Sequence, residues 1–564
     1  MSMSDFSRNT LGCLLLTGLF CLGCDQVAVS PSGKSTESPA ATRAPANLDL
    51  ADELPRAVAD SSALANETYD ATAESPMLLV QRRPLSTFSI DIDTASYSNI
   101  RRFLRHGQLP PPEAVRIEEC LNYFSYDYPV PQGDRPFTVH AEVAGCPWNP
   151  AHRLARIGIQ GRRIATDRRP SCNLVFLVDV SGSMNHPKKL PLLKESLQLL
   201  VKQLGENDHV AIVVYAGAAG LVLPSISAAR QSEITRALEE LQAGGSTNGA
   251  LGMRLAYDIA VDNFMQDGVN RVILCTDGDF NVGISDRTEL TQFIETKAKS
   301  GVFLSCLGFG MGNLKDATLE SLADHGNGHY AYIDGRAEAK KVLVDQLSGT
   351  LVTIAKDVKI QVEFNPRQIS GYRLVGYDNR RLADRDFNDD TKDAGEIGAG
   401  HSVTALYELV PAGVNLAEQG SSAPGALKYQ LGVKPVIDSD VAPKGDSIAE
   451  PSPENVDKEL FTIAVRYKAP AGDRSEKVEF AVTDVGTTFD GATSDFRFAA
   501  AVAQFGMLLK QSSYRGQASF DSVLETADGA RENDLDGYRA EFYELCRIAA
   551  ALRSGSARST TPAD

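Results

Sequence analysis

The residues best suited to chemistry lie in three short segments of the chain, each rich in side-chain oxygens. Asp179, Ser181 and Ser183 alternate in the segment LVFLVDVSGSM. Thr247 lies in the glycine-rich segment GGSTNG, and Asp277 lies in CTDGDF. Two kinds of chemistry use such residues: nucleophilic catalysis by a serine, and binding of a metal ion by carboxylate and hydroxyl oxygens.

The serines do not fit a catalytic nucleophile. The nucleophile elbow of serine hydrolases has the spacing G-x-S-x-G, with a glycine on both sides of the serine. Here Gly182 lies between Ser181 and Ser183, and neither serine has both glycines. His186 follows in the same loop, where the fold cannot position it separately as a base. We therefore expect no catalytic residue and predict that the chain is not an enzyme.

The same residues suit a hard cation. Asp179 and Asp277 each follow an apolar run that is typical of a buried strand, and ligands bind at that end of the strands in doubly wound sheets. Three hydroxyls, from Ser181, Ser183 and Thr247, would complete an all-oxygen set of the kind that Mg²⁺ prefers. The pattern predicts a Mg²⁺ site, with Mn²⁺ or Ca²⁺ as alternatives.

Alternating strands and helices must position these segments. From Cys172 onward, apolar runs such as NLVFLVDV, HVAIVVYAG, RVILCTDG and VFLSCLGFG alternate with amphipathic helical patterns. One helical stripe has leucines spaced by three and four residues, at Leu190, Leu193, Leu197, Leu200 and Leu204. Such alternation predicts an α/β domain over residues 171–355, with a doubly wound, Rossmann-like parallel sheet covered by helices on both faces.

The combination of motifs resembles a known family. D-x-S-x-S, a threonine in a glycine-rich loop and T-D-G after a strand are similar to the metal-ion-dependent adhesion site of von Willebrand factor type A domains. The resemblance implies that Ser181, Ser183 and Thr247 are hydroxyl ligands, and that Asp179 and Asp277 bind the ion directly or through water. It also implies an open coordination position that accepts a carboxylate from a protein partner.

The flanking segments resemble those of a bacterial family of lipoproteins that contain an A domain. FSIDIDTASYSNIRRFLRHGQLPPPEAVRIEECLNYF resembles its N-terminal segment, and NRRLADRDFNDDTKDAGEIGAGHSVTALYEL its C-terminal region. We predict an α+β unit over residues 81–170, a mainly β sandwich over 356–490 with a flexible insertion at 411–457, and helices over 491–555. Alternatively, the strands before and after the A domain pack together in one composite domain.

The first residues indicate export. Leu11 to Leu22 are almost wholly apolar but too few to span a bilayer, and they precede CLGC. This resembles a lipobox, with Cys24 as the lipidated residue and Cys21 where an aliphatic residue is usual. We predict a lipoprotein signal peptide over residues 1–24 and a disordered tether over 25–80. The protein would be lipid-anchored to a bacterial membrane of the cell envelope, facing the periplasm or the exterior.

The net charge bears on nucleic acid as a partner, and the cysteine spacing bears on zinc binding and disulfides. The net charge is −17, and no cluster of Lys and Arg with aromatic residues is present, so nucleic acid is not an expected partner. No C-x-x-C spacing occurs, which leaves a zinc site without support. The sequence leaves open whether two of Cys120, Cys146 and Cys172 form a disulfide. It also does not determine the oligomeric state.

Two acidic motifs invite other functions. Asp91 and Asp93 in SIDIDTAS have the spacing of a haloacid-dehalogenase motif, but no series of strands and helices follows to build that fold. We therefore interpret them as lining a turn or capping a helix. Asp384, Asp386 and Asn388 have calcium-loop spacing, but Asp389 and Gly395 replace the glycine and glutamate of an EF-hand. A surface acidic turn is the better interpretation, with a loose Ca²⁺ site as the alternative.

These patterns together predict an exported, membrane-tethered adhesion or scaffold protein that captures a partner's acidic side chain through a bound metal ion. One alternative is a subunit of a larger enzyme or ATPase-coupled assembly; the chain has no G-x-x-x-x-G-K-[ST] loop, so the ATPase would be another chain. The other is a structural scaffold of the envelope whose metal ion stabilises the fold.

Overall fold

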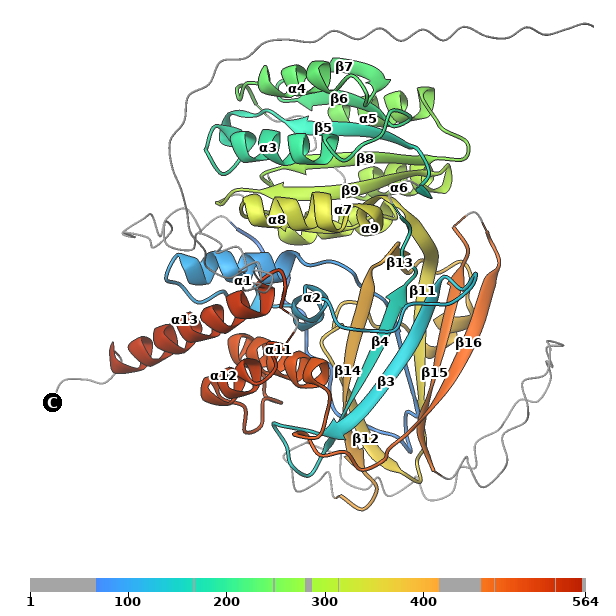
Figure 1. Ribbon diagram of the computed structural model, residues 1–564, viewed down its shortest axis with the longest axis vertical. Helices are drawn as coiled ribbons and strands as arrows, with labels where there is room; N and C mark the ends of the chain where they lie inside the picture. Colours follow the sequence, from blue (N-terminus) through green and yellow to red (C-terminus); the bar gives the residue numbers. More distant parts are fainter. Residues whose placement is uncertain are drawn as a thin grey trace, which may run out of the picture. The chain divides into compact units, whose positions relative to one another are not determined.

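The computed structural model describes residues 67–165, 168–246, 249–278, 287–312, 314–414, 458–470, 472–532 and 534–559. The middle of the chain forms a six-stranded sheet in the order β10-β9-β8-β5-β6-β7 (Figure 1). Its strands are β5 (Cys172–Asp179), β6 (His209–Tyr215), β7 (Ala219–Ser227), β8 (Val269–Thr276), β9 (Val302–Phe309) and β10 (Tyr330–Ile333). All neighbouring strands are parallel except the edge strand β7, which is antiparallel to β6. The predicted doubly wound α/β fold is confirmed.

Helices cover both faces of this sheet because successive side chains of a buried strand point in opposite directions. Phe176 and Val178 of β5 face a core shared with α3 (Leu190–Val201), α4 (Gln231–Glu239), α8 (Arg336–Lys340) and α9 (Leu347–Leu351). Val175 and Leu177 face the core formed with α5 (Gly249–Asp262), α6 (Arg287–Lys299) and α7 (Asp316–His325). The α3 leucines are buried as their spacing predicts.

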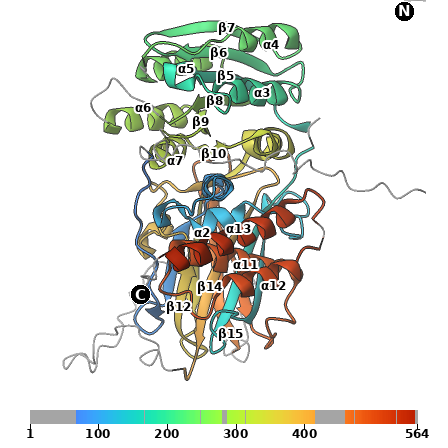
Figure 2. The same ribbon diagram turned by 90° about the vertical axis from the view of Figure 1, so that its left-hand side faces the viewer.

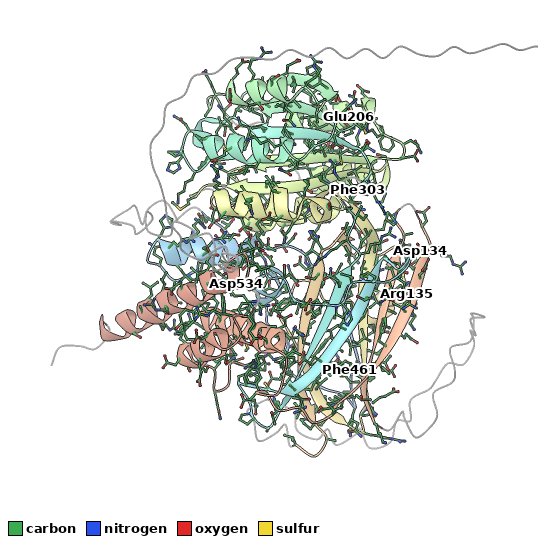
Figure 3. All side chains as sticks on the ribbon, in the orientation of Figure 1. Asp134, Arg135, Glu206, Phe303, Phe461 and Asp534 are labelled. Carbon is green, nitrogen blue, oxygen red and sulfur yellow. The ribbon has the colours of Figure 1, made fainter. Side chains whose placement is uncertain are left out.

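A β-sandwich is built from chain segments on both sides of the α/β domain. One sheet has the order β1-β12-β14-β4-β3, and in the other β11 pairs with β2, β13 and β15, and β15 with β16. The first sheet contains β1 (Leu78–Leu79), β3 (Phe137–Gly145), β4 (Arg153–Gly161), β12 (Ile369–Val375) and β14 (Ser402–Pro411). The second contains β2 (Leu85–Ser89), β11 (Thr353–Phe364), β13 (Gly395–Gly398), β15 (Glu459–Lys468) and β16 (Ser475–Thr483). Phe461, labelled in Figure 3, belongs to the core between the two sheets.

Five helices cover the outer face of the first sheet, as Figure 2 shows for several of them. They are α1 (Ala95–Arg105), α2 (Ile117–Asn122), α11 (Ser494–Lys510), α12 (Phe520–Asp528) and α13 (Tyr538–Ser559). Leu154 of β4 and Leu406 of β14 point into this helical core, while Ile157 and Ile159 of β4 point into the sandwich. The central strand β4 is therefore buried on both faces. No helix within the described ranges combines the length and the apolar character that crossing a bilayer requires.

The predicted separate unit over residues 81–170 does not form a body of its own. β4 pairs with β14 from Ser402↔Gln160 to Leu409↔Arg153, and β2 pairs with β11 from Lys359↔Ser89 to Glu363↔Leu85. The alternative of one composite domain is the one that the structure shows. The physical reason is that neither segment alone supplies enough strands to bury the apolar faces of these sheets.

The predicted tether ends earlier than residue 80. The Glu67 side chain is 1% exposed and forms an ion pair with Arg102 at 2.7 Å. Thr68 donates its N–H to the Leu314 carbonyl, and β1 pairs with β12. Little apolar periodicity marks this stretch, and it is ordered by backbone hydrogen bonds and a buried ion pair that the composition of the stretch does not reveal.

The structure answers two questions that the sequence leaves open, namely the state of three cysteines and the conformation of the acidic turn. Cys120, Cys146 and Cys172 are buried free thiols, so none of the possible bridges between them is formed. The segment from Asp384 to Asn388 is a 3₁₀ helix in which Asp384 accepts a hydrogen bond from Thr87. The insertion predicted over residues 411–457 is described only as far as Val414.

Buried guanidinium groups join the α/β domain to the helices of the composite domain. Arg101 of α1 is 3% exposed and pairs with Asp334 at 2.6 Å and Glu338 at 2.8 Å, both after β10. It also pairs with Glu541 of α13 at 3.1 Å. One cation thus connects two parts of the composite domain with the end of the α/β sheet. Such a network orients its partners because each charge must keep its counter-charge once water is excluded.

Replacing Arg101 with Met should lower the free energy of unfolding by about 3–5 kcal/mol, since it leaves buried carboxylates without a counter-charge. Arg105→Met is the matched control: Arg105 also pairs with Glu541, but its side chain is 38% exposed. Its loss should cost about 0–1 kcal/mol. Urea denaturation followed by circular dichroism measures both variants. Equal stabilities of the two variants would contradict the role given to Arg101.

Candidate functional site

The D-x-S-x-S segment forms a tight loop at the carboxyl end of β5. Asp179 is the last residue of β5, and Gly182–Met184 forms a turn of 3₁₀ helix anchored by the buried Met184 side chain. The Ser181 N–H donates to Asp179 Oδ1 at 2.8 Å. The Ser181 and Ser183 hydroxyl oxygens lie 3.0 Å apart. The alternation in the sequence therefore brings one carboxylate and two hydroxyls to one place.

Neighbouring strands hold the Asp179 carboxylate in position. Tyr215 at the end of β6 donates its hydroxyl to Asp179 Oδ2 at 3.2 Å, and Thr276 at the end of β8 donates to the same oxygen at 2.9 Å. Both residues lie at the edge of the sheet where β5 ends, because β6 and β8 are the parallel neighbours of β5. Neither residue was predicted from the sequence. Both lie near the carboxyl end of an apolar run that predicts a strand, and that position is the signal that could have identified them.

The glycine-rich loop after α4 is tied to the same place by backbone hydrogen bonds. Gly244 donates its N–H to the Val180 carbonyl at 2.7 Å, and the Gly182 N–H donates to the Gly245 carbonyl at 3.1 Å. Gly245 has a φ of +87°, a conformation that other residues rarely adopt. Thr247, the predicted third hydroxyl ligand, lies outside the described residues.

The second carboxylate is paired with a buried lysine that the sequence analysis did not identify. Asp277 follows β8, is 1% exposed, and accepts a hydrogen bond from Lys189 Nζ at 2.7 Å. Lys189 is 7% exposed and ends the loop that begins with the two serines. Its alkyl chain lies against Gly310, where a Cβ would overlap it. Nothing in the pattern of the loop distinguishes Lys189 from the exposed Lys188 beside it.

The electrostatics of the site follow from burial. Burial raises the pKa of Asp179 because water no longer solvates its charge, while hydrogen bonds from Ser181 oppose the rise and the negative charge of Asp277 adds to it. Asp277 pairs with the buried ammonium group of Lys189, whereas the Asp179 carboxylate accepts hydrogen bonds from the Ser181 N–H and from the hydroxyls of Tyr215 and Thr276. Two buried carboxylates at the same edge of the sheet make this place favourable for a cation.

The described donors fit a hard divalent ion. Asp179, Asp277, Ser181 and Ser183 offer only oxygens, and no sulfur or imidazole ligand of the kind that selects softer metals lies among them. The arrangement can therefore bind a cation, and Ser183, the least buried of the four, lies on the solvent side.

A second group of carboxylates lies among arginine side chains. Asp91, Glu119 and Glu320 offer oxygens within 4.8 Å of one another. Arg380 pairs with Asp91 at 3.3 Å and Glu320 at 3.0 Å, and Arg116 pairs with Glu119. Two guanidinium groups thus already lie at the place where a metal ion would bring its charge. We interpret this group as a buried ion-pair network between α2, α7 and the loop after β12.

The SIDIDTAS motif belongs to the same network. Asp91 Oδ1 accepts the Asp93 N–H at 2.8 Å, so Asp91 lines a turn. Asp93 Oδ1 accepts the N–H of Tyr330 at 2.7 Å and thereby holds the first residue of β10. The carboxylates of Asp91 and Asp93 both contact Arg380. The prediction that Asp91 lines a turn is confirmed.

Comparison with known proteins places each part of the chain. Residues 173–346 match the family described as von Willebrand factor type A domain, residues 63–156 match one described as von Willebrand factor, and residues 349–552 match the C-terminal region of the uncharacterized protein YfbK. YfbK of Escherichia coli is 42% identical over 488 residues, which cover 85% of this chain and 80% of YfbK. Inter-alpha-trypsin inhibitor heavy chain H4 of Homo sapiens is 29% identical over 27% of this chain and 17% of its own length.

Solved structures also match parts of the chain. A von Willebrand factor type A protein from Catenulispora acidiphila is 14% identical, covers 73% of this chain and 89% of its own, and has a TM-score of 0.39. The protein BatB from Bacteroides thetaiotaomicron is 20% identical, covers 32% of this chain and 98% of its own, and has a TM-score of 0.28. At such values the assignment rests on the matched sequence families and the strand order.

Replacing Lys189 with Met should destabilise the protein by about 3–5 kcal/mol in chelator-treated buffer, because the variant buries the Asp277 carboxylate without its counter-charge. Lys188→Met is the matched control, since it changes the adjacent exposed lysine and should have little effect. Urea denaturation in the presence of EDTA measures both. A Lys189→Met variant as stable as the wild type would show that the ion pair does not support this edge of the sheet.

Proposed function

Since this chain belongs to the family of YfbK and contains a von Willebrand factor type A domain, we propose that it is a non-enzymatic binding protein that captures an acidic side chain of a partner protein through a metal ion. The observation that supports this most is the convergence of Asp179, Ser181, Ser183 and Asp277 at one edge of the sheet. The family match supports a role in protein interaction. The metal dependence is our proposal.

In this proposal, the hydroxyls of Ser181 and Ser183 and the carboxylates of Asp179 and Asp277 hold Mg²⁺, with Mn²⁺ or Ca²⁺ as alternatives, and Thr247 adds a third hydroxyl. A bound ion supplies Lewis acidity toward one more oxygen ligand. Tyr215 and Thr276 fix the orientation of Asp179. Lys189 neutralises part of the charge of Asp277, which leaves the loaded site with net positive charge toward an incoming carboxylate.

Isothermal titration of Mg²⁺ into the metal-free full chain should show one site. Ser183→Ala removes one hydroxyl ligand at a partly exposed position and should weaken binding at least tenfold, and Asp277→Asn should abolish it. Asp258→Asn is the control, because Asp258 is an exposed carboxylate of α5. Thermal melting of each variant verifies its fold. Unchanged Mg²⁺ affinity in a folded Ser183→Ala or Asp277→Asn variant would overturn the assigned site.

A retention experiment distinguishes capture of a partner protein from the alternative of a structural scaffold whose metal ion stabilises the fold. Immobilised wild type should retain a partner from an envelope extract in Mg²⁺ and release it in EDTA, and the Ser183→Ala variant should retain less. Retention that survives both EDTA and the substitution would contradict capture through a metal ion. A fall in melting temperature on chelation without any change in retention would favour the scaffold.

We also propose that the protein is lipid-anchored in a bacterial cell envelope, on the basis of the apolar N-terminal run and CLGC. Cys24 lies outside the described residues. Cys24→Ala should abolish incorporation of a labelled fatty acid and release the protein from the membrane fraction. Cys21→Ala is the matched control and should remain labelled. Fatty-acid labelling of the Cys24→Ala variant would contradict the anchor site.

A further inference from the structure

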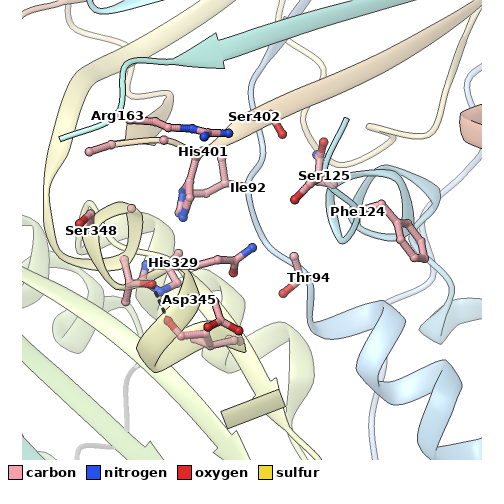
Figure 4. Close-up of a pocket in the computed structure, with 18 of the residues that line it drawn as sticks. Ile92, Thr94, Phe124, Ser125, Arg163, His329, Asp345, Ser348, His401 and Ser402 are labelled. Atoms are coloured by element: carbon pink, nitrogen blue, oxygen red, sulfur yellow. Dashed lines mark hydrogen bonds between the residues drawn. The ribbon is translucent and has the colours of Figure 1, made fainter. Parts of the chain in front are cut away.

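A polar cavity lies between the α/β domain and the composite domain, at the opposite edge of the sheet from Asp179. Its volume is about 360 Å³, which is in the range of small-molecule sites. His329, Asp345 and Ser348 line it from the α/β domain, and Arg163 and His401 from the composite domain. Figure 4 shows these side chains around the same hollow. We call it the interface cavity.

Two imidazoles that line the interface cavity have ring nitrogens without a hydrogen-bond partner in the described part of the chain. His329 is 8% exposed and its Nε2 is buried and has no such partner, and the same holds for Nδ1 of His401. The two ring centroids lie 6.5 Å apart with perpendicular planes. Burial and the nearby charge of Arg271 lower the pKa of His329 well below its ordinary value and that of His401 to about 4, so both rings are neutral at pH 7. Unpartnered polar groups of this kind are rare in protein interiors.

A hydrogen-bond chain behind His329 determines what it presents to the cavity. The Arg271 guanidinium donates to Ser305 Oγ at 2.6 Å, so the Ser305 hydroxyl hydrogen is available for His329 Nδ1, which lies 3.3 Å away. With Nδ1 accepting, the neutral ring carries its proton on Nε2. His329, which lines the cavity, therefore carries a buried N–H donor at Nε2, and Arg271 lies on the other side of its ring, beyond Ser305.

Arg271 is itself short of negative charge. It is 2% exposed, and among the described residues its Nε has no hydrogen-bond partner and no carboxylate forms an ion pair with it, although the buried Glu396 is near enough to act on its charge. Burial lowers its pKa to about 10 because the charged form has lost its water. It lies over the ring of Phe303, labelled in Figure 3, with 5.7 Å between the guanidinium carbon and the ring centroid. An anion in the cavity would supply part of the missing counter-charge through Ser305 and His329.

The rim of the cavity adds a second cation, Arg163, and one carboxylate, Asp345. Arg163 is exposed at the cavity and forms no ion pair with any residue that the structure describes. Asp345, the acidic residue of the lining, already pairs with Lys340 at 3.1 Å. Arg271 lies behind Ser305 and His329, so Arg163 is the guanidinium of the lining that can contact a ligand directly. One such group with neutral imidazoles matches a single negative charge better than the two of a phosphate, and Asp345, Gln346 and Ser348 offer acceptors for a second polar group.

We propose that the interface cavity binds a small polar carboxylate, whose oxygens accept hydrogen bonds from His329 Nε2 and Arg163. This site is independent of the one at Asp179. Because its donors come from both domains, the ligand would connect them and stabilise the folded chain by mass action.

Saturation-transfer NMR of the full chain with lactate, succinate, L-glutamate and inorganic phosphate at millimolar concentration tests the proposal. At least one carboxylate should give a signal and raise the melting temperature. Arg163→Ala should weaken that binding at least tenfold, and Arg162→Ala, which changes the adjacent exposed arginine outside the lining, should not. His329→Asn should also weaken it, if that variant melts cooperatively.

Three results would overturn the proposal. The first is the absence of binding by every carboxylate, and the second is equal affinity in the wild type and Arg163→Ala. The third is stronger binding of phosphate than of any carboxylate, which would show that the cavity carries more positive charge than we infer. Carboxylate binding that is lost in Arg163→Ala and kept in Arg162→Ala would support it.

Discussion

The pairing of β4 with β14 is the constraint on which the rest of the structure depends. Eight successive residue pairs join the strand that precedes the α/β domain to one that follows it. β4 is buried on both faces, by the second sheet and by the helices. The chain must therefore leave this sheet, build the whole α/β domain, and return to the same sheet in register. The composite domain has no complete core until its later segments arrive, so its formation depends on contacts that are distant in sequence.

This constraint explains why the junction contains so many buried charges. An inserted domain joined through two chain connections can still rotate unless side chains oppose it. Arg101, Arg116 and Arg380 each bind carboxylates from both the α/β domain and the composite domain. Buried ion pairs add little net stability compared with apolar packing, but they penalise every arrangement that separates the charges. The network is thus better suited to fixing orientation than to increasing stability.

The α/β sheet has a buried cation near each end of its strands, and the two cations have different surroundings. At the carboxyl ends of the strands, Lys189 pairs with Asp277, and Asp179 places a second buried carboxylate beside that pair. At the opposite edge, Arg271 has no carboxylate within ion-pair distance among the described residues and faces neutral imidazoles through Ser305. The first edge is suited to a cation and the second to an anion. Both follow from the cost of leaving a buried charge without its counter-charge.

The sequence by itself determined the local elements and the clustering of the site. Apolar runs ending in Asp179 and Asp277 predicted parallel strands whose carboxyl ends meet, and the structure brings the described residues of that set together. Periodicity is a local property, so it reports which face of a strand or helix is buried. It contains no information on which distant strand completes a sheet. Tertiary structure alone decided that β4 pairs with β14, that Glu67 is buried, and that Lys189 rather than Lys188 pairs with Asp277. Each of these depends on a neighbour that is remote in sequence, such as Gly310 against Lys189, whose position exists only once the chain has folded.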